Sequence, residues 1–462
     1  MVVGSMDVNT DLLVIGSGPG GYVAALRAAK LGLDVMLVEE QEKLGGVCLN
    51  WGCIPTKAMI KASNYYAVIQ ELEMMGISIK DYDLDFNKMR DWKESIITKL
   101  EKGIRGLCKS FGIEIIHGRA VFTDKKKVRI EGKSDVTGIT FNNCIISTGS
   151  KSIELKELPF NHEKIISDKE ILSLTQIPKR LAIIGGGYIG TEMATVFSKL
   201  GSEVYLIELG DRLIPLLDKE ITDVIQKELE NKGVKIMLNT KASGFKENPF
   251  RLCLDKDLEV DKVLVVIGRT PNLDLGLEAA GVEFDKFIKV NEEMRTSNPN
   301  IFAVGDVAGQ PMLAHKASKQ AKVAAEVIGG LKSAYDPLCV PSVVFNDPEI
   351  ASVGLTQKEA EEKGFEVKIG RYPFSNSGRA MIERKPIGFI KIIGDKKTDI
   401  ILGMQAVGPL VSEYVSEVAL AIELGATLED LALTIHPHPT NSEGLMEAAE
   451  DANNLAIHIY KK

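Results

Sequence analysis

A strand–glycine turn–helix–strand unit occurs twice in the chain at the same spacing, and this repeat constrains the fold more than any other feature. The first copy runs from DLLVIG at residues 11–16 to a strand that ends at Glu39, and the second from LAIIGG at residues 181–186 to a strand that ends at Glu208. The distance from the first glycine to the acid is 23 residues in both copies (39 − 16 and 208 − 185). Two copies with matched spacing predict two dinucleotide-binding domains of the Rossmann type.

Each glycine of a G-x-G-x-x-G turn has its own task. The first allows the tight turn, the second lets the backbone approach a pyrophosphate, and the third lets the helix pack on the strand. The N-terminus of the following helix offers free N–H groups and the positive end of its dipole to the phosphates. The predicted phosphate-binding glycines are Gly16, Gly18 and Gly21 in the first copy and Gly185, Gly187 and Gly190 in the second.

The acid at the end of each second strand is placed to accept hydrogen bonds from a ribose. Two such sites predict two dinucleotides, and the natural pair is a flavin with a nicotinamide, that is FAD with NAD. A carboxylate pairs with a free 2′-hydroxyl and repels a 2′-phosphate, so Glu208 favours NAD over NADP. Arg212, four residues further on, leaves NADP open as the alternative.

Composition narrows the class of protein. At 462 residues the chain is too long for one hydrophobic core, and its contents of 45% apolar and 26% charged residues are typical of a soluble globular protein. A net charge of −8 argues against a broad nucleic-acid surface. Neither a signal peptide nor a run of eighteen apolar residues is found, so we expect no membrane association and a cytoplasmic or similarly reducing location.

The last part of the chain follows another pattern. From about Pro341, strand-like segments are grouped with helical ones rather than alternating with them strictly. This grouping predicts a separate α+β domain behind the two Rossmann units. The predicted fold class is therefore α/β, with two dinucleotide-binding domains and a C-terminal α+β domain.

Residues 45–57, GGVCLNWGCIPTK, contain two cysteines, Cys48 and Cys53. A structural zinc site needs four ligands, usually as two close pairs, so we predict no metal. The remaining cysteines are scattered and lie in apolar runs, as expected of inert thiols: Cys108, Cys144, Cys253 and Cys339. Redox chemistry and an inert core pair remain as the interpretations of Cys48 and Cys53.

A disulfide between Cys48 and Cys53 requires a break in regular helix. Five steps along an ideal helix rise about 7.5 Å and turn the two side chains about 140° apart. A disulfide needs Cα atoms within about 4.4–6.8 Å of each other. Gly52 and Pro55 fit an irregular first turn, and the helix that follows is expected to lower the thiolate pKa near its N-terminus.

Thiol–disulfide exchange proceeds through a thiolate, so a base must accept a proton. His438 lies in the proline-rich segment TIHPHPTNSEG, and Glu443 follows it by five residues. A carboxylate that orients the ring is what a general-base histidine needs. On spacing alone, a hydrogen-bonded loop histidine is an equally good interpretation. His436 lies in the same segment, whereas His117, His162, His315 and His458 are interpreted as structural.

These residues resemble a known family. GGVCLNWGCIPTK resembles the redox-active disulfide of the pyridine nucleotide–disulfide oxidoreductases, and GSGPGG, GGGYIG, IFAVGDV, MLAHKA and HPHPTNSE extend the resemblance over the whole chain. The chain is most similar to the class I members that oxidise dihydrolipoamide. The resemblance implies an FAD-binding domain with the redox disulfide at 1–150 and an NAD-binding domain at 151–268. It further implies a central segment completing the FAD site at 269–340, and a dimer-interface domain at 341–462.

The resemblance also implies roles for individual residues. Cys48 would be the thiol that meets the substrate and Cys53 the thiol that faces the flavin. His438, oriented by Glu443, would serve the disulfide of the other subunit of a homodimer. The FAD-binding residues would be Gly16, Gly18, Gly21, Glu39, Lys57, Gly118, Thr148, Gly149, Asp306 and Ala314. The NAD-binding residues would be Gly185, Gly187, Gly190, Glu192, Glu208 and Gly268, with Glu192 paired to Lys57.

The implied partners are dihydrolipoamide or lipoylated proteins of a 2-oxo acid dehydrogenase or glycine cleavage system. A glutathione reductase-like enzyme that uses NADPH is the first alternative, and Glu208 speaks against it. Relatives with a second, C-terminal cysteine pair are disfavoured because no cysteine follows Cys339. A flavoprotein redox sensor is a further alternative. Trp51 departs from the family pattern, which usually has a small aliphatic residue there.

Overall fold

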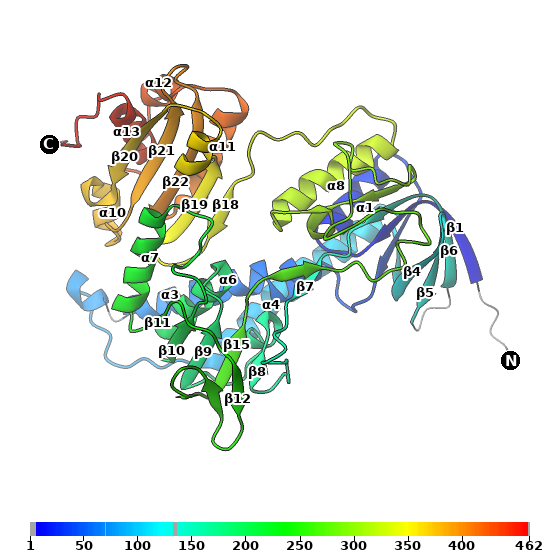
Figure 1. Ribbon diagram of the computed structural model, residues 1–462, viewed down its shortest axis with the longest axis horizontal. Coiled ribbons are helices and arrows are strands. Elements are labelled where there is room, and N and C mark those ends of the chain that lie inside the picture. The colour runs from blue at the N-terminus through cyan, green and yellow to red at the C-terminus, as the bar shows by residue number, and fades with distance from the viewer. Residues whose placement is uncertain (1–5, 70, 133–135, 461–462) are drawn as a thin grey trace. The chain divides into compact units, whose positions relative to one another are not determined.

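The computed structural model describes residues 6–69, 71–132 and 136–460. The chain forms two compact units, each assembled from three segments (Figure 1). The first unit contains the described residues up to Ala58, Asp85–Ile153 and Gly268–Asp336. The second contains Met59–Leu84, Glu154–Ile267 and the described residues from Pro337 onward. The predicted boundaries of four regions stay predictions.

The first unit is built on a sheet with the strand order β3-β2-β1-β6-β5-β4, and β17 pairs with β6 as well. The strands β1, β2, β3, β6 and β17 run parallel to one another, whereas β5 pairs antiparallel with both β6 and β4. Their bounds are β1 Met6–Ile15, β2 Val35–Glu39, β3 Glu114–His117, β4 Arg119–Asp124, β5 Lys127–Glu131, β6 Val136–Ile146 and β17 Ile301–Ala303.

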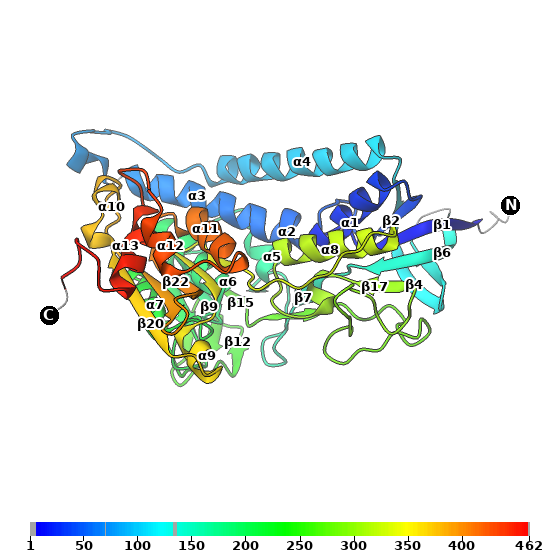
Figure 2. The same cartoon turned by 90° about the horizontal axis from the view of Figure 1, so that it is seen from above.

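Apolar residues on both faces of this sheet are buried, which is typical of a parallel sheet covered by other elements on both sides. The helices α1 (Pro19–Lys30) and α8 (Ala314–Ile328) lie side by side in both views (Figures 1 and 2). They pack closely through alanines such as Ala24, Ala28, Ala321 and Ala324. Figure 2 also shows the long helix α4 passing along α1 and α2.

The remaining elements of the first unit are short or peripheral. A two-stranded antiparallel ribbon joins β7 to β16. The helix α3 begins in the first unit and continues into the second. The bounds are α1 Pro19–Lys30, α2 Gly46–Trp51, α3 Cys53–Ile69, α4 Phe86–Ser110, β7 Ser150–Ser152, β16 Arg269–Pro271, η2 Gly305–Ala308 and α8 Ala314–Ile328.

The second unit contains a parallel sheet with the order β11-β10-β9-β15-β8, accompanied by α5, α6 and α7, and a small antiparallel sheet β12-β13-β14. The bounds are η1 Leu72–Met75, β8 Ile165–Ile166, α5 Asp168–Ile171, β9 Arg180–Ile184, α6 Tyr188–Lys199, β10 Glu203–Ile207, α7 Lys219–Asn231, β11 Lys235–Met237, β12 Gly244–Lys246, β13 Arg251–Cys253, β14 Leu258–Glu259 and β15 Lys262–Val265.

The C-terminal part of the second unit is an antiparallel sheet with the order β18-β19-β22-β21-β20. Helices α11 and α13 contact this sheet, and alternate strand residues such as Ile390, Ile392 and Met404 are buried in the same apolar cluster as residues of both helices. The bounds are β18 Ser342–Val344, β19 Glu349–Gly354, α9 Gln357–Glu362, β20 Val367–Pro373, η3 Phe374–Asn376, α10 Gly378–Ile382, β21 Phe389–Asp395, β22 Ile401–Gly408, α11 Val411–Glu423, α12 Leu428–Leu433 and α13 Glu443–Ala452.

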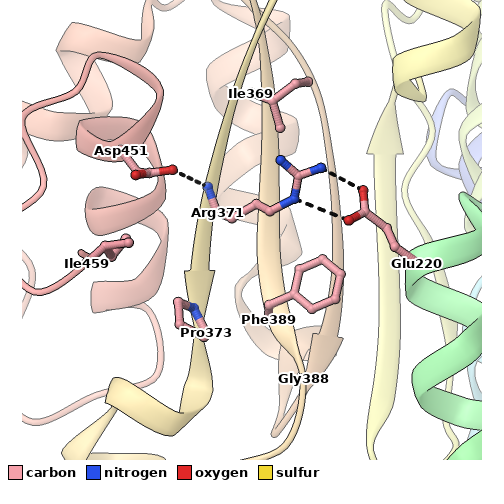
Figure 3. Close-up of a pocket in the computed structure, with 8 residues that line it drawn as sticks. All are labelled: Glu220, Ile369, Arg371, Pro373, Gly388, Phe389, Asp451 and Ile459. Carbon is pink, nitrogen blue, oxygen red and sulfur yellow. Dashed lines mark hydrogen bonds and ion pairs between the residues drawn. The ribbon is translucent and has the colours of Figure 1, made fainter. Parts of the chain in front are cut away.

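Lys391, on the other face of this sheet, is joined to the start of α7 by charged side chains. The Lys391 side chain is 2% exposed and lies 2.7 Å from the Asp218 carboxylate and 2.6 Å from that of Glu220. Glu220 also accepts two hydrogen bonds from Arg371, beside a cavity of about 420 Å³ (Figure 3). The two carboxylates therefore balance the charge of the two cations. The predicted α/β class with a C-terminal α+β domain is confirmed.

Candidate functional site

The first glycine of each predicted turn occupies a backbone conformation that only glycine adopts readily. Gly16 has φ +94° and Gly185 has φ +110°. A Cβ atom would lie 2.3 Å from the Ser147 carbonyl oxygen at Gly16, and 2.5 Å from the Val266 carbonyl oxygen at Gly185. In both copies the turn is therefore pressed against the strand that neighbours the first strand of the motif.

The third and second glycines also meet their predicted tasks. A Cβ at Gly21 would lie 1.7 Å from the carbonyl oxygen of Gly16, and one at Gly190 would lie 1.9 Å from that of Gly185. At the middle glycines the space is open, because a Cβ at Gly187 meets nothing within 4 Å. The corresponding Cβ at Gly18 meets only the Gly46 Cα, at 4.0 Å.

Gly18 and Gly187 are the N-cap residues of α1 and α6, and neither helix has a side-chain cap. An open space in front of an uncapped helix N-terminus fits the pyrophosphate of a dinucleotide.

The two acids are held in the same way, a detail that the sequence did not predict. One carboxylate oxygen accepts a hydrogen bond from the amide after the first glycine, at 2.8 Å from Ser17 N to Glu39 and 2.6 Å from Gly186 N to Glu208. The other oxygen accepts from the amide two residues beyond the acid, at 2.8 Å for Gln41 and 2.7 Å for Gly210. Each carboxylate is thus fixed beside its turn, and its remaining lone pairs can accept ribose hydroxyls.

The cysteine pair spans a break between two helices, as its spacing predicted. Helix α2 ends at Trp51, Gly52 has φ −133° and ψ −113°, and α3 begins at Cys53. A Cβ at Gly52 would lie 2.9 Å from the Val47 carbonyl oxygen and 3.3 Å from the Cys48 Cα. Glycine at this position therefore lets α3 start directly against the turn that carries Cys48.

Both cysteines are free thiols, with Cys48 half-buried and Cys53 exposed. The Cys48 side chain is hydrogen-bonded to that of Cys53, and this bond is the largest cause of a raised pKa at Cys48. Burial raises the pKa further, whereas the positive charge of Lys57, one helical turn beyond Cys53, lowers it. The backbone of Cys53, at the N-terminus of α3, also lowers the pKa of Cys48 as expected, but the partner thiol and burial outweigh this effect.

The glycine turn of the first copy is joined directly to the cysteine helix. The Gly45 amide lies 3.1 Å from both the Ser17 carbonyl oxygen and Ser17 Oγ. Gly46 has φ +60°, and a Cβ there would lie 2.7 Å from the Cα of Gly18. This contact sets the N-terminus of α2, and with it Cys48, against the dinucleotide turn. The paired glycines ahead of Cys48 leave room for this close approach.

Several other residues predicted for FAD lie at the ends of the strands next to this turn. Thr148 Oγ1 donates a hydrogen bond to the Asn272 carbonyl oxygen (2.8 Å), and the Asp306 carboxylate accepts one from Ser150 Oγ (2.5 Å). Gly149 has φ +68°. These residues follow β6 and β17, which run parallel with β1, so their side chains belong to the edge of the sheet where open α/β sheets bind ligands.

Two further FAD-predicted residues are placed by backbone structure. The Gly118 amide donates to the carbonyl oxygen of Glu39 (2.9 Å), and Ala314 is the first residue of α8. The first unit therefore contains all ten residues predicted to bind FAD. Their binding of FAD stays a prediction.

The residues predicted for NAD are divided between the units. The three glycines of the second turn, Glu208 and Glu192 lie in the second unit, where the buried Glu192 accepts a hydrogen bond from the Phe345 amide (2.9 Å). Gly268, with φ +133°, begins the third segment of the first unit. The Arg269 side chain beside it donates to Ser150 Oγ (2.9 Å). Val266 and Ile267, directly before Gly268, lie beside Gly185 of the second turn, and the binding of NAD by Gly268 stays a prediction.

His438 and Glu443 are in contact, as their spacing predicted. His438 Nδ1 lies 2.8 Å from Glu443 Oε1, and the histidine side chain is 80% exposed. The second oxygen of Glu443 accepts a hydrogen bond from the Thr440 amide (2.7 Å). The carboxylate is therefore fixed from two sides, and it orients an exposed ring whose Nε2 can exchange a proton.

The residues described by the structure contain no group of three or more histidine, cysteine or acidic side chains suited to a metal ion. Within the same described ranges, every helix is too short or too polar to cross a membrane.

Comparison with known proteins agrees with this arrangement. Residues 10–321 match the pyridine nucleotide-disulphide oxidoreductase family, and residues 340–449 match the dimerisation domain of that family. The chain is 43% identical over 472 residues to a dihydrolipoyl dehydrogenase of Bacillus subtilis (strain 168), with 100% of both chains covered. A dihydrolipoyl dehydrogenase of Geobacillus stearothermophilus is 44% identical over 472 residues, again with 100% of both chains covered.

Among solved structures, the HOCl-induced flavoprotein disulfide reductase RclA of Escherichia coli superimposes with a TM-score of 0.86 at 27% identity. The match covers 95% of this chain and 99% of that one. The family match, the full-length relatives and the cysteine pair beside a dinucleotide turn lead to one conclusion: the chain belongs to the pyridine nucleotide-disulphide oxidoreductase family.

Proposed function

We propose that this protein is a dihydrolipoamide dehydrogenase, which oxidises dihydrolipoamide to lipoamide and reduces NAD+ to NADH with FAD as the intermediate carrier. The observation that carries the proposal is the contact between the cysteine helix and the first dinucleotide turn, through Gly45 and Gly46. It places a hydrogen-bonded dithiol beside a cradle that fits a flavin dinucleotide. The dihydrolipoyl dehydrogenases that match the whole chain supply the substrate.

The cysteines carry the exchange chemistry. In the oxidised enzyme a thiolate of dihydrolipoamide attacks the sulfur of Cys48, and the Cys48–Cys53 bond breaks to release the thiolate of Cys53. The second substrate thiol then displaces Cys48, which closes the lipoamide disulfide and leaves both cysteines reduced. FAD, held at the first glycine turn and Glu39, would supply the two-electron transfer between the reduced cysteines and NAD+.

His438 moves the protons of this exchange. Its Nε2 accepts a proton from the attacking thiol, while the hydrogen bond from Nδ1 to Glu443 keeps the ring in one orientation. In the homodimer that we propose, each His438 serves the cysteine pair of the other subunit. The full reaction converts one dithiol and NAD+ into a disulfide, NADH and one proton.

The two turns and their acids hold the dinucleotides. The amides of α1 and α6 would bind the pyrophosphates, while Glu39 and Glu208 would bind the ribose hydroxyls. Lys57 contributes a positive charge that favours the thiolate form of Cys48. In the cell, the substrate would be the lipoyl group of a 2-oxo acid dehydrogenase or glycine cleavage system in the cytoplasm.

Steady-state assays test this function. Dihydrolipoamide, glutathione disulfide and mercuric ion are each supplied as substrate, with NAD(H) and with NADP(H). We expect the highest kcat/KM with dihydrolipoamide and NAD+. Faster turnover of glutathione disulfide with NADPH would assign the protein to the glutathione reductase-like alternative. A flavoprotein that turns over none of the three would be a redox sensor.

Cysteine variants test the electron path. Cys48→Ser and Cys53→Ser should each abolish dihydrolipoamide oxidation and retain the absorbance spectrum of bound FAD. Near-normal activity in either variant would contradict the proposed chemistry. Cys144→Ser is the matched control, because Cys144 is buried in strand β6 and contributes to no proposed step.

A further inference from the structure

The loop that links α12 to α13, residues 434–442, turns its two histidines in opposite directions. The side chain of His436 is 3% exposed, whereas that of His438 is 80% exposed. The loop itself is not buried, since Ile435, next to His436, is 94% exposed. Specific contacts must therefore hold the His436 ring inside.

Both ring nitrogens of His436 face hydrogen-bond acceptors. Nε2 lies 2.9 Å from Glu417 Oε1, and Nδ1 lies 2.8 Å from the Thr434 carbonyl oxygen. A neutral imidazole has one N–H group and can satisfy only one of two acceptors. The imidazolium form has two N–H groups and satisfies both. The geometry therefore favours a positively charged His436.

The charges around the ring favour this form. Glu417, on α11, is hydrogen-bonded to the ring and is the largest cause of a raised pKa at His436, and Glu443 at the start of α13 adds a smaller attraction. Burial acts in the opposite direction. Because the folded-state pKa is raised, the stabilisation is complete below the unfolded-state value and is lost as pH rises through the folded-state value.

The segment that carries His438 is otherwise bonded mainly to itself. Thr440 Oγ1 donates to the Pro437 carbonyl oxygen (2.7 Å), and the Thr440 amide donates to the same Glu443 that binds His438. On the N-terminal side of His438, the contact of His436 with Glu417 attaches this segment to α11. On the C-terminal side, Asn441 Nδ2 donates to Glu383 Oε2 (3.0 Å).

We propose that His436 is a positioning residue for the exchange base. As an imidazolium held between Glu417 and the Thr434 carbonyl oxygen, it fixes the loop in the arrangement that presents Nε2 of His438. His436 touches no reacting atom and acts only through His438. The inference rests on the proposed function, since it assigns a partner to the base of that reaction.

His436→Gln tests the role, because a glutamine side chain has no positive charge and cannot span both acceptors. We expect kcat for dihydrolipoamide oxidation to fall about tenfold to a hundredfold, the loss typical of a displaced catalytic group. The reduction of ferricyanide by NADH, which needs no thiol exchange, should keep its wild-type rate. An equal loss in both reactions would overturn the positioning role.

His458→Gln is the matched control. His458 Nδ1 lies 2.5 Å from Glu447 Oε1, so the same type of pair is removed outside the loop of the base. This variant should retain the wild-type rate of dihydrolipoamide oxidation. A loss as large as that of His436→Gln would overturn the inference, and so would a His436→Gln variant that keeps full activity.

The pH profile tests the charge. In the wild type, the exchange rate should fall as pH rises through the raised pKa of His436. In Glu417→Gln the fall should begin at lower pH, because the largest cause of the raised pKa is removed. If the exchange rate of Glu417→Gln fell at the same pH as that of the wild type, the role of the His436–Glu417 pair would be overturned.

Hydrogen–deuterium exchange separates this inference from the proposed function. Residues 434–442 should lose protection in His436→Gln, whatever the substrate of the enzyme. Unchanged protection of this loop overturns the inference. A wild-type protein that fails to oxidise dihydrolipoamide overturns the proposed function, and the hydrogen–deuterium exchange measurement still decides the role of His436.

Discussion

The two dinucleotide turns are alike in local structure and differ in what the chain does after each acid. In the first copy, the chain returns to its own turn through Gly45 and Gly46 and starts the cysteine helix against it. In the second copy, the chain also returns to its turn, where the Ile214 amide donates to the Gly186 carbonyl oxygen (3.0 Å). It then continues into α7, whose N-terminus is joined by Asp218 and Glu220 to Lys391 of the C-terminal sheet.

The turn itself therefore specifies binding, whereas the element after it specifies what the bound dinucleotide meets. Both turns have a first glycine with positive φ, a third glycine in backbone contact and an acid held by two amides. A redox-active dithiol adjoins only one of them among the residues described. The comparison leads to four predictions, beginning with the largest expected effect.

Alanine at the third glycine of each turn should disrupt that turn and weaken the binding of its own dinucleotide. In Gly21→Ala the new Cβ would lie 1.7 Å from the carbonyl oxygen of Gly16, and in Gly190→Ala it would lie 1.9 Å from that of Gly185. We expect Gly21→Ala to be purified without FAD. Gly190→Ala should retain the flavin spectrum and lose about a hundredfold in NAD+ affinity, a free energy of about 2.7 kcal/mol.

Flavin absorbance and a titration with NAD+ distinguish the two variants. Loss of flavin from Gly190→Ala, or full flavin in Gly21→Ala, would contradict the assignment of the two turns. Gly32→Ala is the control, because it has φ +87° and a Cβ there meets nothing within 4 Å.

Removal of Lys391 should break the attachment of α7. Lys391→Ala leaves two carboxylates near a largely buried position, with Arg371 as the remaining cation beside Glu220. Loss of one partner of a buried ion pair typically costs about 3–5 kcal/mol of unfolding free energy. Denaturant unfolding measures this loss. Lys219→Ala removes an exposed pair with Asp223 and should cost less than about 1 kcal/mol.

Much of the two turns could be predicted from the sequence because their determinants are local. Gly16, Gly18 and Gly21 lie within six residues, and the conformation of each follows from a strand that ends and a helix that begins. The break between Cys48 and Cys53 was predictable for the same reason, since helix geometry alone forbids a disulfide between them within one regular helix.

The contacts that connect distant segments were not predictable. The bond from Gly45 to Ser17 joins residues 28 positions apart, and no periodic pattern encodes it. The raised pKa of Cys48 was missed because it depends on the orientation of the Cys53 thiol. His436 was noted only as a neighbour of His438, because Glu417 lies 19 residues away on another helix. Such contacts exist only after the tertiary fold has formed.

Gly46→Ala tests the close approach that places the cysteine helix against the first turn. Alanine at φ +60° costs about 1–2 kcal/mol, and its Cβ would press on the Cα of Gly18 at 2.7 Å. The cysteine helix must then move away from the turn, so we expect dihydrolipoamide oxidation to fall about tenfold. Steady-state kinetics at saturating NAD+ measures this effect.

Gly112→Ala is its matched control. Gly112 has φ +70°, so alanine meets a similar backbone cost, but a Cβ there has no neighbour within 4 Å. This variant should lose stability and keep its kcat. If both variants lost activity equally, backbone strain rather than the contact with Gly18 would be the cause.

The smallest expected effect concerns the acid of the second copy. Both oxygens of Glu208 accept hydrogen bonds from backbone N–H groups. In Glu208→Gln one of these oxygens becomes an NH2 group, which cannot accept, so one backbone N–H loses its acceptor. The loss of one such hydrogen bond is worth about 1 kcal/mol, and we expect the KM for NAD+ to rise about fivefold with kcat unchanged. Glu208→Gln also removes the charge that repels a 2′-phosphate. The ratio of kcat/KM for NAD+ to that for NADP+ should therefore fall by more than fivefold.

Glu39→Gln changes the equivalent acid of the first copy. It should weaken FAD retention while the KM for NAD+ stays constant. A rise in that KM would show that the two turns do not bind separate dinucleotides.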